Sequence, residues 1–526
     1  MVALRQDARW TRAVRPLVGF AQALALDAST KESYGLSDDM LMESAAIGMA
    51  RFLEEDEAFR VALGSSAVPA VALCGGGNNG GDALAVARRL AFSGRTGIVA
   101  VVSPRLGPVA RRRLDEARLA GVSALEPTDE RAARAVAEAG LVLDGAIGVG
   151  FKGPARPELA EFARLATLAR GPVIAIDVPS GLGPLRSRES DPAPPVRAAA
   201  TLCVEPLKAE AFYQGNRRHC GRIVPISGVF HRSAGLGSGT VLLEPGDLGA
   251  FLPEPDPDCH KGERGALAVF AGSPGSAGAA ALCARGGSAA GAGSVTLLTG
   301  EALVPILSAT LVSQMVRPAS DPGSRRFTAA VAGPGWGADE PNARALDGLW
   351  DAAMPLALDA DALGLLASAG KAPRCSPLVL TPHPGEFAPL AAVAMGADPD
   401  DPEALGLAAR RARFDTAAVL AEAAARFGAV VVLKGSVTWI GDPDGRLAVW
   451  DGRDPGLATA GSGDVLAGLA GGFLARGAGA WDAAVAATLV HGLAGRAAAY
   501  KGFYEAEGLL PEAARISRRD AHGNEG

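Results

Sequence analysis

The chain has 526 residues, more than one hydrophobic core usually serves, so two or more domains are expected. A net charge of -6 and an aromatic content of 5% argue against nucleic acid as the main partner. The six cysteines include no C-x-x-C pair, which argues against a disulfide scaffold or a zinc site and favours a reducing cytoplasm. No apolar run reaches the ~20 residues that would span a bilayer.

From residue 68 onward, short apolar runs alternate with helical stretches. The predicted strands of this first series are 68–73, 96–102, 141–143 and 173–176. The predicted helices between them are about 83–92, 111–119 and 159–168. This alternation predicts a parallel sheet with helices on both faces, whose ligands bind at the carboxyl ends of the strands.

Three loops at that sheet edge carry side-chain oxygens. Residues 74–82 read Cys-Gly-Gly-Gly-Asn-Asn-Gly-Gly-Asp, where glycines let backbone N–H groups approach a phosphate at the start of a helix. A tight turn would need only the glycines. Asp144 and the segment Asp177-Val178-Pro179-Ser180 follow two further strands, although one such aspartate alone is often a turn cap. Oxygen ligands from Asn79, Asp144 and Ser180 could together hold an alkali or alkaline-earth cation.

With these loops, the first half resembles the NAD(P)H-hydrate epimerase family, from Ala21-Gln22 and Asp27, through Leu41-Met42-Glu43-Ser44-Ala45, to Lys208 and Gly221-Arg222-Ile223. The resemblance implies a Rossmann-like domain over residues 1–229 that interconverts the R and S hydrates, with Asp177 shuttling protons. It implies K⁺ binding by Asn79, Asp144 and Ser180. It also implies that the hydrate is bound by Asn78, Asn79, Gly80, Gly81, Asp82, Gly148, Val149, Gly150, Phe151, Lys152, Gly153, Pro154 and Asp177.

Three residues depart from the family pattern: Ala83 replaces a glycine, Val149 a threonine and Ala200 an aspartate. These replacements put in doubt the rate of epimerisation and the geometry of the loops more than the assignment to the family. They also keep open an alternative in which the first domain is a non-catalytic module that binds a nucleotide or a partner.

The periodicity lapses between Ser227 and His260, where glycine and serine give way to proline and acidic residues. This stretch is the predicted domain connection, with a short strand at 241–243 inside it. A second α/β series follows, with predicted strands at 266–271, 294–298, 329–332, 356–358, 378–380 and 430–433. The last predicted helices lie at about 465–476 and 481–500.

Three motifs in the second half carry chemistry. Residues 459–464, Thr-Ala-Gly-Ser-Gly-Asp, open a helix whose N–H groups can stabilise a transferring phosphoryl group, and Asp464 can accept a proton from a hydroxyl. Lys434 follows one strand, and Thr381-Pro382-His383-Pro384-Gly385-Glu386 follows another. For each residue an ordinary structural role is the alternative: Asp464 as a helix cap, Lys434 as a core-strand side chain reaching solvent, and His383 as a turn residue.

Together with His260-Lys261-Gly262, Gly333-Pro334-Gly335-Trp336-Gly337 and Asp359-Ala360-Asp361-Ala362-Leu363, these motifs resemble the ADP-dependent NAD(P)H-hydrate dehydratase family. The resemblance implies a ribokinase-like domain over residues 240–526 that uses ADP with Mg²⁺, Glu386 lying in the outer shell of the metal. It implies hydrate contacts from Ala279, Gly337, His383 and Asp464. It implies nucleotide contacts from Lys434, Gly435, Ser436, Val437, Thr438 and Gly463.

The two resemblances imply a cytoplasmic bifunctional repair enzyme built from two three-layer α/β domains. It would epimerise the hydrates of NADH and NADPH and, with ADP, dehydrate the S hydrate to NAD(P)H, AMP and phosphate. The expected partners are the small molecules NADHX, NADPHX and ADP, and a homo-oligomer is expected, without nucleic acid or membrane. A ribokinase-type kinase acting on a small alcohol, such as a thiazole or pyrimidine precursor, remains the alternative enzyme. It would yield a stable phosphorylated alcohol instead of free phosphate.

Overall fold

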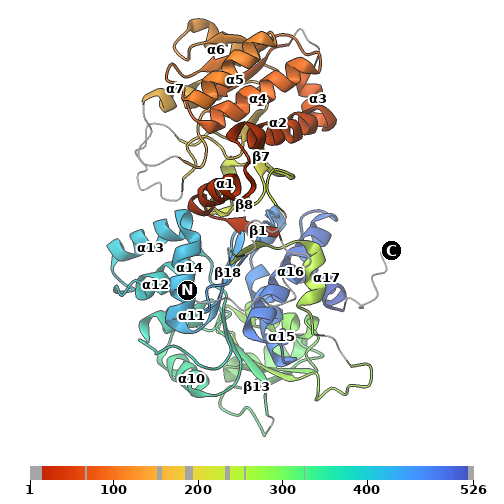
Figure 1. Ribbon diagram of the computed structural model, residues 1–526. Helices are drawn as coiled ribbons and strands as arrows, with labels where there is room; N and C mark the ends of the chain where they lie inside the picture. The colour runs from red at the N-terminus through yellow and green to blue at the C-terminus, as the bar shows by residue number, and fades with distance from the viewer. Residues whose placement is uncertain are drawn as a thin grey trace. The chain divides into compact units, whose positions relative to one another are not determined.

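The computed structural model describes residues 15–64, 68–150, 157–183, 194–231, 237, 239–253, 256–324 and 326–518 (Figure 1). The chain divides into two compact units. Pro16–Ser238 form the first, here called the N-terminal unit. Gly239–Gly526, with Met1–Arg15, form the second, the C-terminal unit. No helix in the described ranges is both long and apolar enough to cross a membrane.

The N-terminal unit is built on a seven-stranded parallel sheet in the order β4-β3-β2-β5-β6-β7-β9. Numbered from its first strand, β2, this begins with the 3-2-1-4-5-6 order of doubly wound dinucleotide-binding folds. The strands are β2 (Ala70–Cys74), β3 (Ile98–Val102), β4 (Ser123–Leu125), β5 (Leu141–Gly145), β6 (Val173–Ile176), β7 (Ala200–Val204) and β9 (Arg222–Ile226).

Helices cover both faces of this sheet, so the three-layer prediction is confirmed. Alternate residues of β2 face opposite layers: Ala70, Ala72 and Cys74 share a core with α2 and α4, whereas Val71 and Leu73 share one with α6 and α7. A strand buried on both faces is apolar throughout, which explains why the sequence showed its strands as unbroken apolar runs. The helices are α2 (Asp38–Glu55), α3 (Glu57–Leu63), α4 (Asn78–Phe92), α5 (Pro108–Leu119), α6 (Glu130–Glu138) and α7 (Pro157–Thr167).

The segment before the sheet forms β1 (Arg15–Val18) and α1 (Phe20–Tyr34). β1 pairs in parallel with β8 (Leu207–Lys208). Only Phe20 and Thr30 of α1 are buried. The helix is held at its start by a hydrogen bond from Phe20 N to Glu210 Oε1 (2.7 Å). Lys31 forms ion pairs with Asp27 of α1 and with Asp38 of α2, and so joins the two helices.

The C-terminal unit has a sheet in the order β13-β12-β11-β14-β15-β16-β17-β18-β19-β10. Its strands are β10 (Thr240–Leu242), β11 (Ala266–Phe270), β12 (Ser294–Thr299), β13 (Met315–Pro318), β14 (Ala329–Ala332), β15 (Leu356–Leu358), β16 (Leu378–Leu380), β17 (Val430–Leu433), β18 (Thr438–Gly441) and β19 (Leu447–Trp450).

This sheet is parallel over most of its strands and antiparallel at β18, a strand that the sequence did not predict. β18 pairs antiparallel with both β17 and β19, while β10 pairs in parallel with β19. The segments joining β17 to β18 and β18 to β19 are only residues 434–437 and 442–446. Connections this short allow hairpins and leave no room for the crossover that parallel neighbours need.

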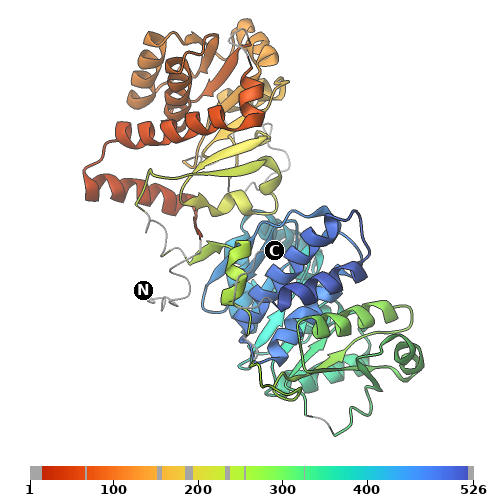
Figure 2. The same ribbon diagram turned by 90° about the vertical axis from the view of Figure 1, so that its right-hand side faces the viewer.

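The helices of the C-terminal unit form two layers. Figures 1 and 2 show α15 and α16 on the other side of the sheet from α11 to α14. α8 packs closely on α15, because a Cβ at Gly468 would stand 2.1 Å from the carbonyl oxygen of Cys283. The helices are α8 (Ala277–Ala289), α9 (Val304–Thr310), α10 (Glu340–Asp351), α11 (Asp361–Ser368), α12 (Pro384–Ala394), α13 (Pro402–Phe414), α14 (Thr416–Phe427), α15 (Ser462–Ala475), α16 (Ala480–Ala499) and α17 (Leu509–Ser517).

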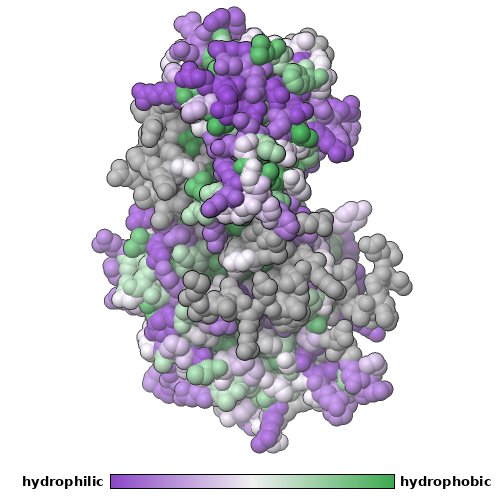
Figure 3. Space-filling view, in the orientation of Figure 1, coloured by the Kyte–Doolittle hydropathy of each residue, from purple (hydrophilic) through white to green (hydrophobic). Residues whose placement is uncertain are grey.

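Burial follows the usual division between core and surface. The core of the C-terminal unit is rich in alanine, and most of α15 and α16 is buried. In the N-terminal unit, the surface over α4 and α5 in Figure 3 is mostly hydrophilic. Both units are therefore α/β folds with a buried core. In such folds, ligands bind at the carboxyl ends of the strands.

Candidate active sites

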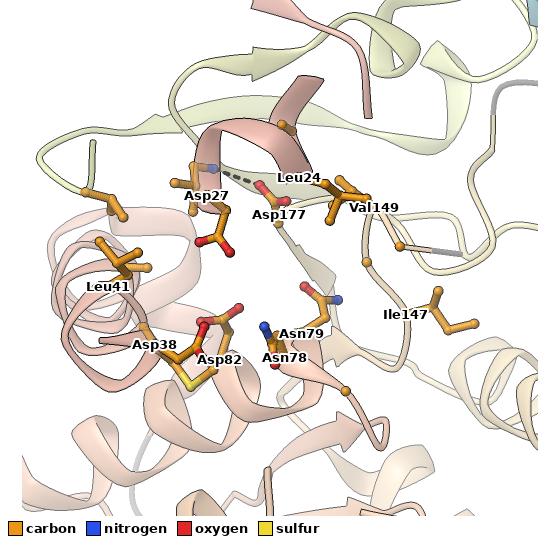
Figure 4. Close-up of a pocket in the computed structure, with 18 of the residues that line it drawn as sticks. Leu24, Asp27, Asp38, Leu41, Asn78, Asn79, Asp82, Ile147, Val149 and Asp177 are labelled. Atoms are coloured by element: carbon orange, nitrogen blue, oxygen red, sulfur yellow. Dashed lines mark hydrogen bonds between the residues drawn. The ribbon is translucent and has the colours of Figure 1, made fainter. Parts of the chain in front are cut away.

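A cavity of about 730 Å³ lies at the carboxyl ends of the strands of the N-terminal unit. This volume is in the range of small-molecule sites. The glycine-rich segment after β2, the segments after β5 and β6, and helices α1 and α2 all contribute to its wall (Figure 4). The sheet edge predicted to bind a ligand is therefore the edge that is hollowed.

The segment Asn78–Asp82 forms the first turns of α4, so the helix begins five residues before its predicted start at 83. No side chain caps the helix at Gly77. A Cβ at Gly80 would stand 1.9 Å from the carbonyl oxygen of Gly75, so only glycine allows this tight entry into the helix. Asn79 is 9% exposed, and its Nδ2 has no hydrogen-bond partner among the described residues. A buried amide donor of this kind is usually satisfied by a partner, so a ligand in the cavity would fit here.

Asp177 lies at the end of β6 with a φ of 63°, in the left-handed region that only glycine adopts readily. Its Oδ1 accepts a hydrogen bond from Val204 N (3.0 Å) and lies 2.5 Å from Lys208 Nζ. Burial is the largest single effect and lowers the pKa of Lys208, but the charge and hydrogen bond of Asp177, together with the charges of Cys203 and Asp82, make the net shift upward. The aspartate thus bonds to neighbouring strands and faces the cavity, which is more than the role of a turn cap.

The structure brings Asp144 and Ser180 together. Ser180 Oγ donates to Asp144 Oδ1 (2.6 Å), and Ser180 N donates to Asp144 Oδ2 (2.8 Å). Asn79 lies beside Gly148, because a Cβ there would be 3.3 Å from Asn79 Oδ1, and the preceding residue, Ile147, donates its backbone N–H to Ser180 Oγ (2.8 Å). Asp144 is fully buried, and that burial raises its pKa to about 6 despite the hydrogen bonds. No basic side chain among the described residues is paired with it, so an added cation would favour its charged form.

The other predicted site residues of the N-terminal unit differ in where they lie. Gly148, Val149 and Gly150 line the cavity, while residues 151–154 lie outside the described residues. Two departures from the family pattern are accommodated in the core. Ala83 is buried against Gly145, where the absence of a side chain leaves space for its methyl group, and Ala200 is a buried residue of β7.

Sequence reasoning missed several residues of this cavity. Asp27 and Asp38 line it from α1 and α2, and Lys208 lines it from β8. Ser103 and Arg105, just after β3, line it as well. α1 and α2 precede the sheet, so periodicity alone did not place Asp27 and Asp38 at the strand ends. Lys208 was noted only as part of a resemblance.

In the C-terminal unit, the central contact is a buried ion pair. Lys434 Nζ lies 2.6 Å from Asp359 Oδ1 and 3.7 Å from Glu386 Oε2. Asp359 is 2% exposed and also accepts a hydrogen bond from Thr381 Oγ1 (2.8 Å). Burial lowers the pKa of Lys434, but the charges of Asp359 and Glu386 raise it by more. Lys434 is thus a positively charged side chain that Asp359 fixes in position. Asp359 was part of a motif in the sequence but was not predicted as a site residue.

Asp464 lies in the first turn of α15 beside this cluster. Burial, and then the charges of Asp359 and Glu386, raise its pKa to about 6, although Lys434 opposes them. No side chain caps α15 at Gly461, and no described residue forms a hydrogen bond with Asp464. A Cβ on Gly463 would lie 3.3 Å from Lys434 Nζ, so the lysine lies beside the glycine loop. Asp464 is therefore poised to accept a proton near neutral pH and does not cap the helix.

The helix start at α12 supports the ordinary structural role for His383. Its Nδ1 accepts hydrogen bonds from Gly385 N (3.0 Å) and Glu386 N (3.3 Å), while Glu386 Oε2 accepts one from His383 N (2.8 Å). This reciprocal pair is a capping arrangement. His383 Nε2 stands 3.2 Å from Glu386 Oε1. The imidazole Nδ1 is therefore committed to the turn, and Nε2 lies beside the Glu386 carboxylate.

The remaining predicted residues lie on α8 and in the segments that follow β14 and β17. Ala279 lies against Gly335, and Gly337 N donates to Asp361 Oδ2 (2.7 Å). Gly435 and Ser436 are exposed. The side chain of Val437 is fully buried, so this residue can contact a nucleotide through its backbone alone.

His491 of α16 contacts the backbone of the glycine-rich segment 459–464. Its Nε2 lies 2.9 Å from the carbonyl oxygen of Ser462. Burial lowers the pKa of His491 to about 4, so the ring is neutral near pH 7 and its Nε2–H can donate to that carbonyl. The sequence reading did not identify this residue.

The two clusters define an α/β enzyme with two chemical centres: Asp177 beside Lys208 in the cavity of the N-terminal unit, and Asp464 near Lys434 at the glycine-rich start of α15. Two family descriptions match the chain: "YjeF-related protein N-terminus" over residues 38–209, and "NAD(P)H-hydrate dehydratase" over residues 267–517. The bifunctional NAD(P)H-hydrate repair enzyme of Mycobacterium tuberculosis is 34% identical over 85% of this chain and 87% of its own length. That of Mycobacterium leprae is 33% identical over 96% and 98%.

A crystal structure of the ADP/ATP-dependent NAD(P)H-hydrate dehydratase from Bacillus subtilis, co-crystallised with ATP/Mg²⁺, is 28% identical. It covers 52% of this chain and 96% of its own, with a TM-score of 0.46. On the identities and coverage of the full-length relatives, the chain belongs to the family of bifunctional NAD(P)H-hydrate repair enzymes.

Proposed function

We propose that the N-terminal unit epimerises hydrated NADH and NADPH and that the C-terminal unit dehydrates the S hydrate with ADP. The observation that carries this proposal is a carboxylate close to a lysine in each unit: Asp177 forms an ion pair with Lys208, and Asp464 lies close enough to Lys434 for the lysine charge to act on its pKa. Asp177, Lys208 and Lys434 lie at strand ends and Asp464 at the start of α15, in a chain whose relatives are named for repair of these hydrates.

Epimerisation needs a group that can move protons beside the hydrated ring. The hydroxyl is on a carbon bonded to the ring nitrogen, whose lone pair can expel it, and water can then add to the other face. Asp177 lines the cavity and is held by Lys208 and Val204 N, so it is positioned to take a proton from the incoming water. Asn79 Nδ2 would donate to the nucleotide hydrate.

Potassium would be held by the oxygens of Asn79, Asp144 and Ser180. The group fits these residues, since Asp144 is a buried carboxylate without a basic partner among the described residues. When bound, K⁺ would supply positive charge that favours the ionised form of Asp144 and fixes the loops after β5 and β6.

Dehydration in the C-terminal unit would begin with Asp464 taking the proton of the substrate hydroxyl. The resulting oxygen attacks the β-phosphorus of ADP, and AMP leaves. The lone pair of the ring nitrogen then expels phosphate, a better leaving group than hydroxide. The adjacent ring carbon loses a proton, which restores the dihydronicotinamide. Backbone N–H groups at the start of α15, with Lys434, would stabilise the transferring phosphoryl group.

Mg²⁺ would accompany the phosphates of ADP and neutralise part of their charge. Glu386 is the carboxylate available to its outer shell, because Glu386 lies 3.7 Å from Lys434 at the same strand-end cluster. The nucleotide itself would contact Lys434, Gly435, Ser436, Val437, Thr438 and Gly463, and the hydrate Ala279, Gly337, His383 and Asp464.

The proposal assigns the epimerase to residues 1–229 and the dehydratase to residues 240–526. The division of contacts at Gly239 supports the boundary between the two, although the same division groups Met1–Arg15 with the C-terminal unit. All six cysteines are free thiols, which supports the cytoplasm as the location. The proposed partners are NADHX, NADPHX and ADP, and the proposed assembly is a homo-oligomer.

The test is to incubate the protein with the hydrate mixture and ADP and to follow dihydronicotinamide absorbance together with released phosphate. We expect absorbance and phosphate to appear in equal amounts. A stable phosphorylated product without free phosphate would instead identify a kinase of the ribokinase type.

A further inference from the structure

We infer that Asp82 is a second catalytic carboxyl group of the N-terminal unit, the proton donor to the departing hydroxide, acting opposite Asp177 as the proton acceptor. This inference rests on the proposed epimerase activity. It goes beyond it because it gives Asp82 a chemical step, where the resemblance implies only contact with the hydrate.

The first observation is the position of Asp82. It lies at the fifth residue of α4, one turn after Asn78, and lines the cavity. Figure 4 shows its carboxyl group and those of Asp27 and Asp177 directed into the same space. Asp82 and Asp177 come from different elements, the start of α4 and the end of β6, so a ring bound between them could meet one carboxyl group on each face.

The second observation is that the two carboxyl groups have different surroundings. Asp177 Oδ1 is bonded to Lys208 and to Val204 N. No described residue forms a hydrogen bond or an ion pair with Asp82. A carboxyl group in a cavity without a partner is one whose hydrogen-bonding capacity is left for the ligand.

The third observation concerns charge. Burial raises the pKa of Asp82 well above its usual value, and the charges of Asp177 and Asp27 raise it further, against opposing effects of Lys208 and Arg113. Asp38 lines the same space from α2 and forms an ion pair with Lys31 of α1. A neutral carboxylic acid can donate a proton, which the neighbouring asparagine side chains cannot do.

In this mechanism, the substrate hydroxyl leaves as water and a second water adds to the opposite face of the same carbon. As the ring nitrogen expels the hydroxyl, the Asp82 carboxyl gives up its proton and water leaves, with an iminium formed in the ring. A water on the opposite face attacks the same carbon, Asp177 takes a proton from it, and the nitrogen regains its lone pair. Proton exchange with solvent returns both carboxyl groups to their starting states. The oxygen of the product therefore comes from solvent.

The test is the full-length Asp82→Asn variant, with Asp115→Asn, an exposed residue of α5, as the matched control. We expect Asp82→Asn to slow epimerisation of the R hydrate by roughly 10²–10⁴-fold, as loss of a general acid does. Incorporation of ¹⁸O from labelled water should slow in parallel, and Asp82→Glu should recover part of the rate. Asp82→Asn retaining a rate within threefold of wild type would overturn the inference.

A second measurement does not depend on any variant. The wild-type epimerisation rate should fall as pH rises, because the donor is lost when Asp82 ionises, and a rate that has not fallen by pH 10 would overturn the inference. Dehydration of pure S hydrate, assayed in the same samples, checks that each protein is folded in its other unit. A wild-type chain that does not epimerise at all would instead contradict the proposed function, so the two failures are distinguishable.

Discussion

Asp359 and Lys434 form a buried ion pair, with Oδ1 and Nζ 2.6 Å apart, at the centre of the C-terminal unit. Lys434 follows β17 and Asp359 follows β15, and Thr381, after β16 between them, donates to the same carboxyl oxygen. Three neighbouring strand ends thus fix the lysine amine beside the glycine loop of α15.

Asp359→Asn should destabilise the C-terminal unit, because it leaves a buried lysine without its counter-charge, a change that typically costs about 3–5 kcal/mol. Thermal unfolding measures this loss. Lys434→Met combined with Asp359→Asn should cost less than the two single changes added together. The exposed Asp347→Asn is the control, and strictly additive effects of the pair would show that the contact contributes nothing.

Asp464→Asn should lower ADP-driven dehydration by roughly 10²–10⁴-fold, since the amide cannot take a proton. Because Asp464 forms no hydrogen bond with any described residue and does not cap α15, the melting temperature should change little. Absorbance assays with pure S hydrate and a melting curve measure both. Dehydratase activity close to wild type would remove Asp464 from the mechanism.

The pH dependence of dehydration should reflect the same residue. A base must be unprotonated to act, so kcat/KM should rise with pH through an apparent pKa of about 6 and then level off. The residual activity of Asp464→Asn should lack this rise. A wild-type profile that is flat between pH 5 and 8 would contradict the assignment.

Epimerisation should depend on a monovalent cation of the size of K⁺. Exchange of K⁺ for tetramethylammonium should slow it, because the methyl groups of that cation prevent direct coordination by the oxygens of Asn79, Asp144 and Ser180. Asp144→Asn should weaken the response to K⁺. Rates that are the same in both salts would show that Asn79, Asp144 and Ser180 do not form a cation site.

The C-terminal unit should fold alone if the fragment begins at Gly239. β10 is part of its sheet, and Leu447 N donates to the carbonyl oxygen of Gly239 (2.8 Å), so a later start would remove the end of the sheet. Residues 239–526 should be soluble and should dehydrate the S hydrate. An insoluble or inactive fragment would show that the units share a core or a site.

The sequence predicted the fold where local patterns determine it. Strands such as 356–358 and 430–433 match β15 and β17, because a strand buried on both faces is continuously apolar. The antiparallel β18 was missed, since direction depends on connection length and partner strand rather than on local pattern. The start of α4 was placed too late, because the glycines of Asn78–Asp82 resemble a loop yet permit the tight helix entry at Gly80.

The sequence predicted the site residues that lie at strand ends. It did not predict the residues that come to the same sites from helices outside the sheet. Asp177 and Lys434 follow strands and Asp144 lies near the end of β5, so topology alone places each at the carboxyl edge of its sheet. Asp27 comes from a helix before the sheet, and His491 comes from a helix after it. Asp27 and His491 reach the two sites only through tertiary packing, which the spacing of residues in the sequence does not predict.

The most direct test of two activities on one chain uses a racemic hydrate mixture with ADP, comparing wild type with Asp177→Asn and following dihydronicotinamide absorbance. Wild type should convert both epimers at a fast rate. Asp177→Asn should convert the S portion equally fast and leave the R portion to its spontaneous epimerisation. If Asp177→Asn consumes both epimers at the wild-type rate, the N-terminal unit does not epimerise through this aspartate and the central claim is contradicted.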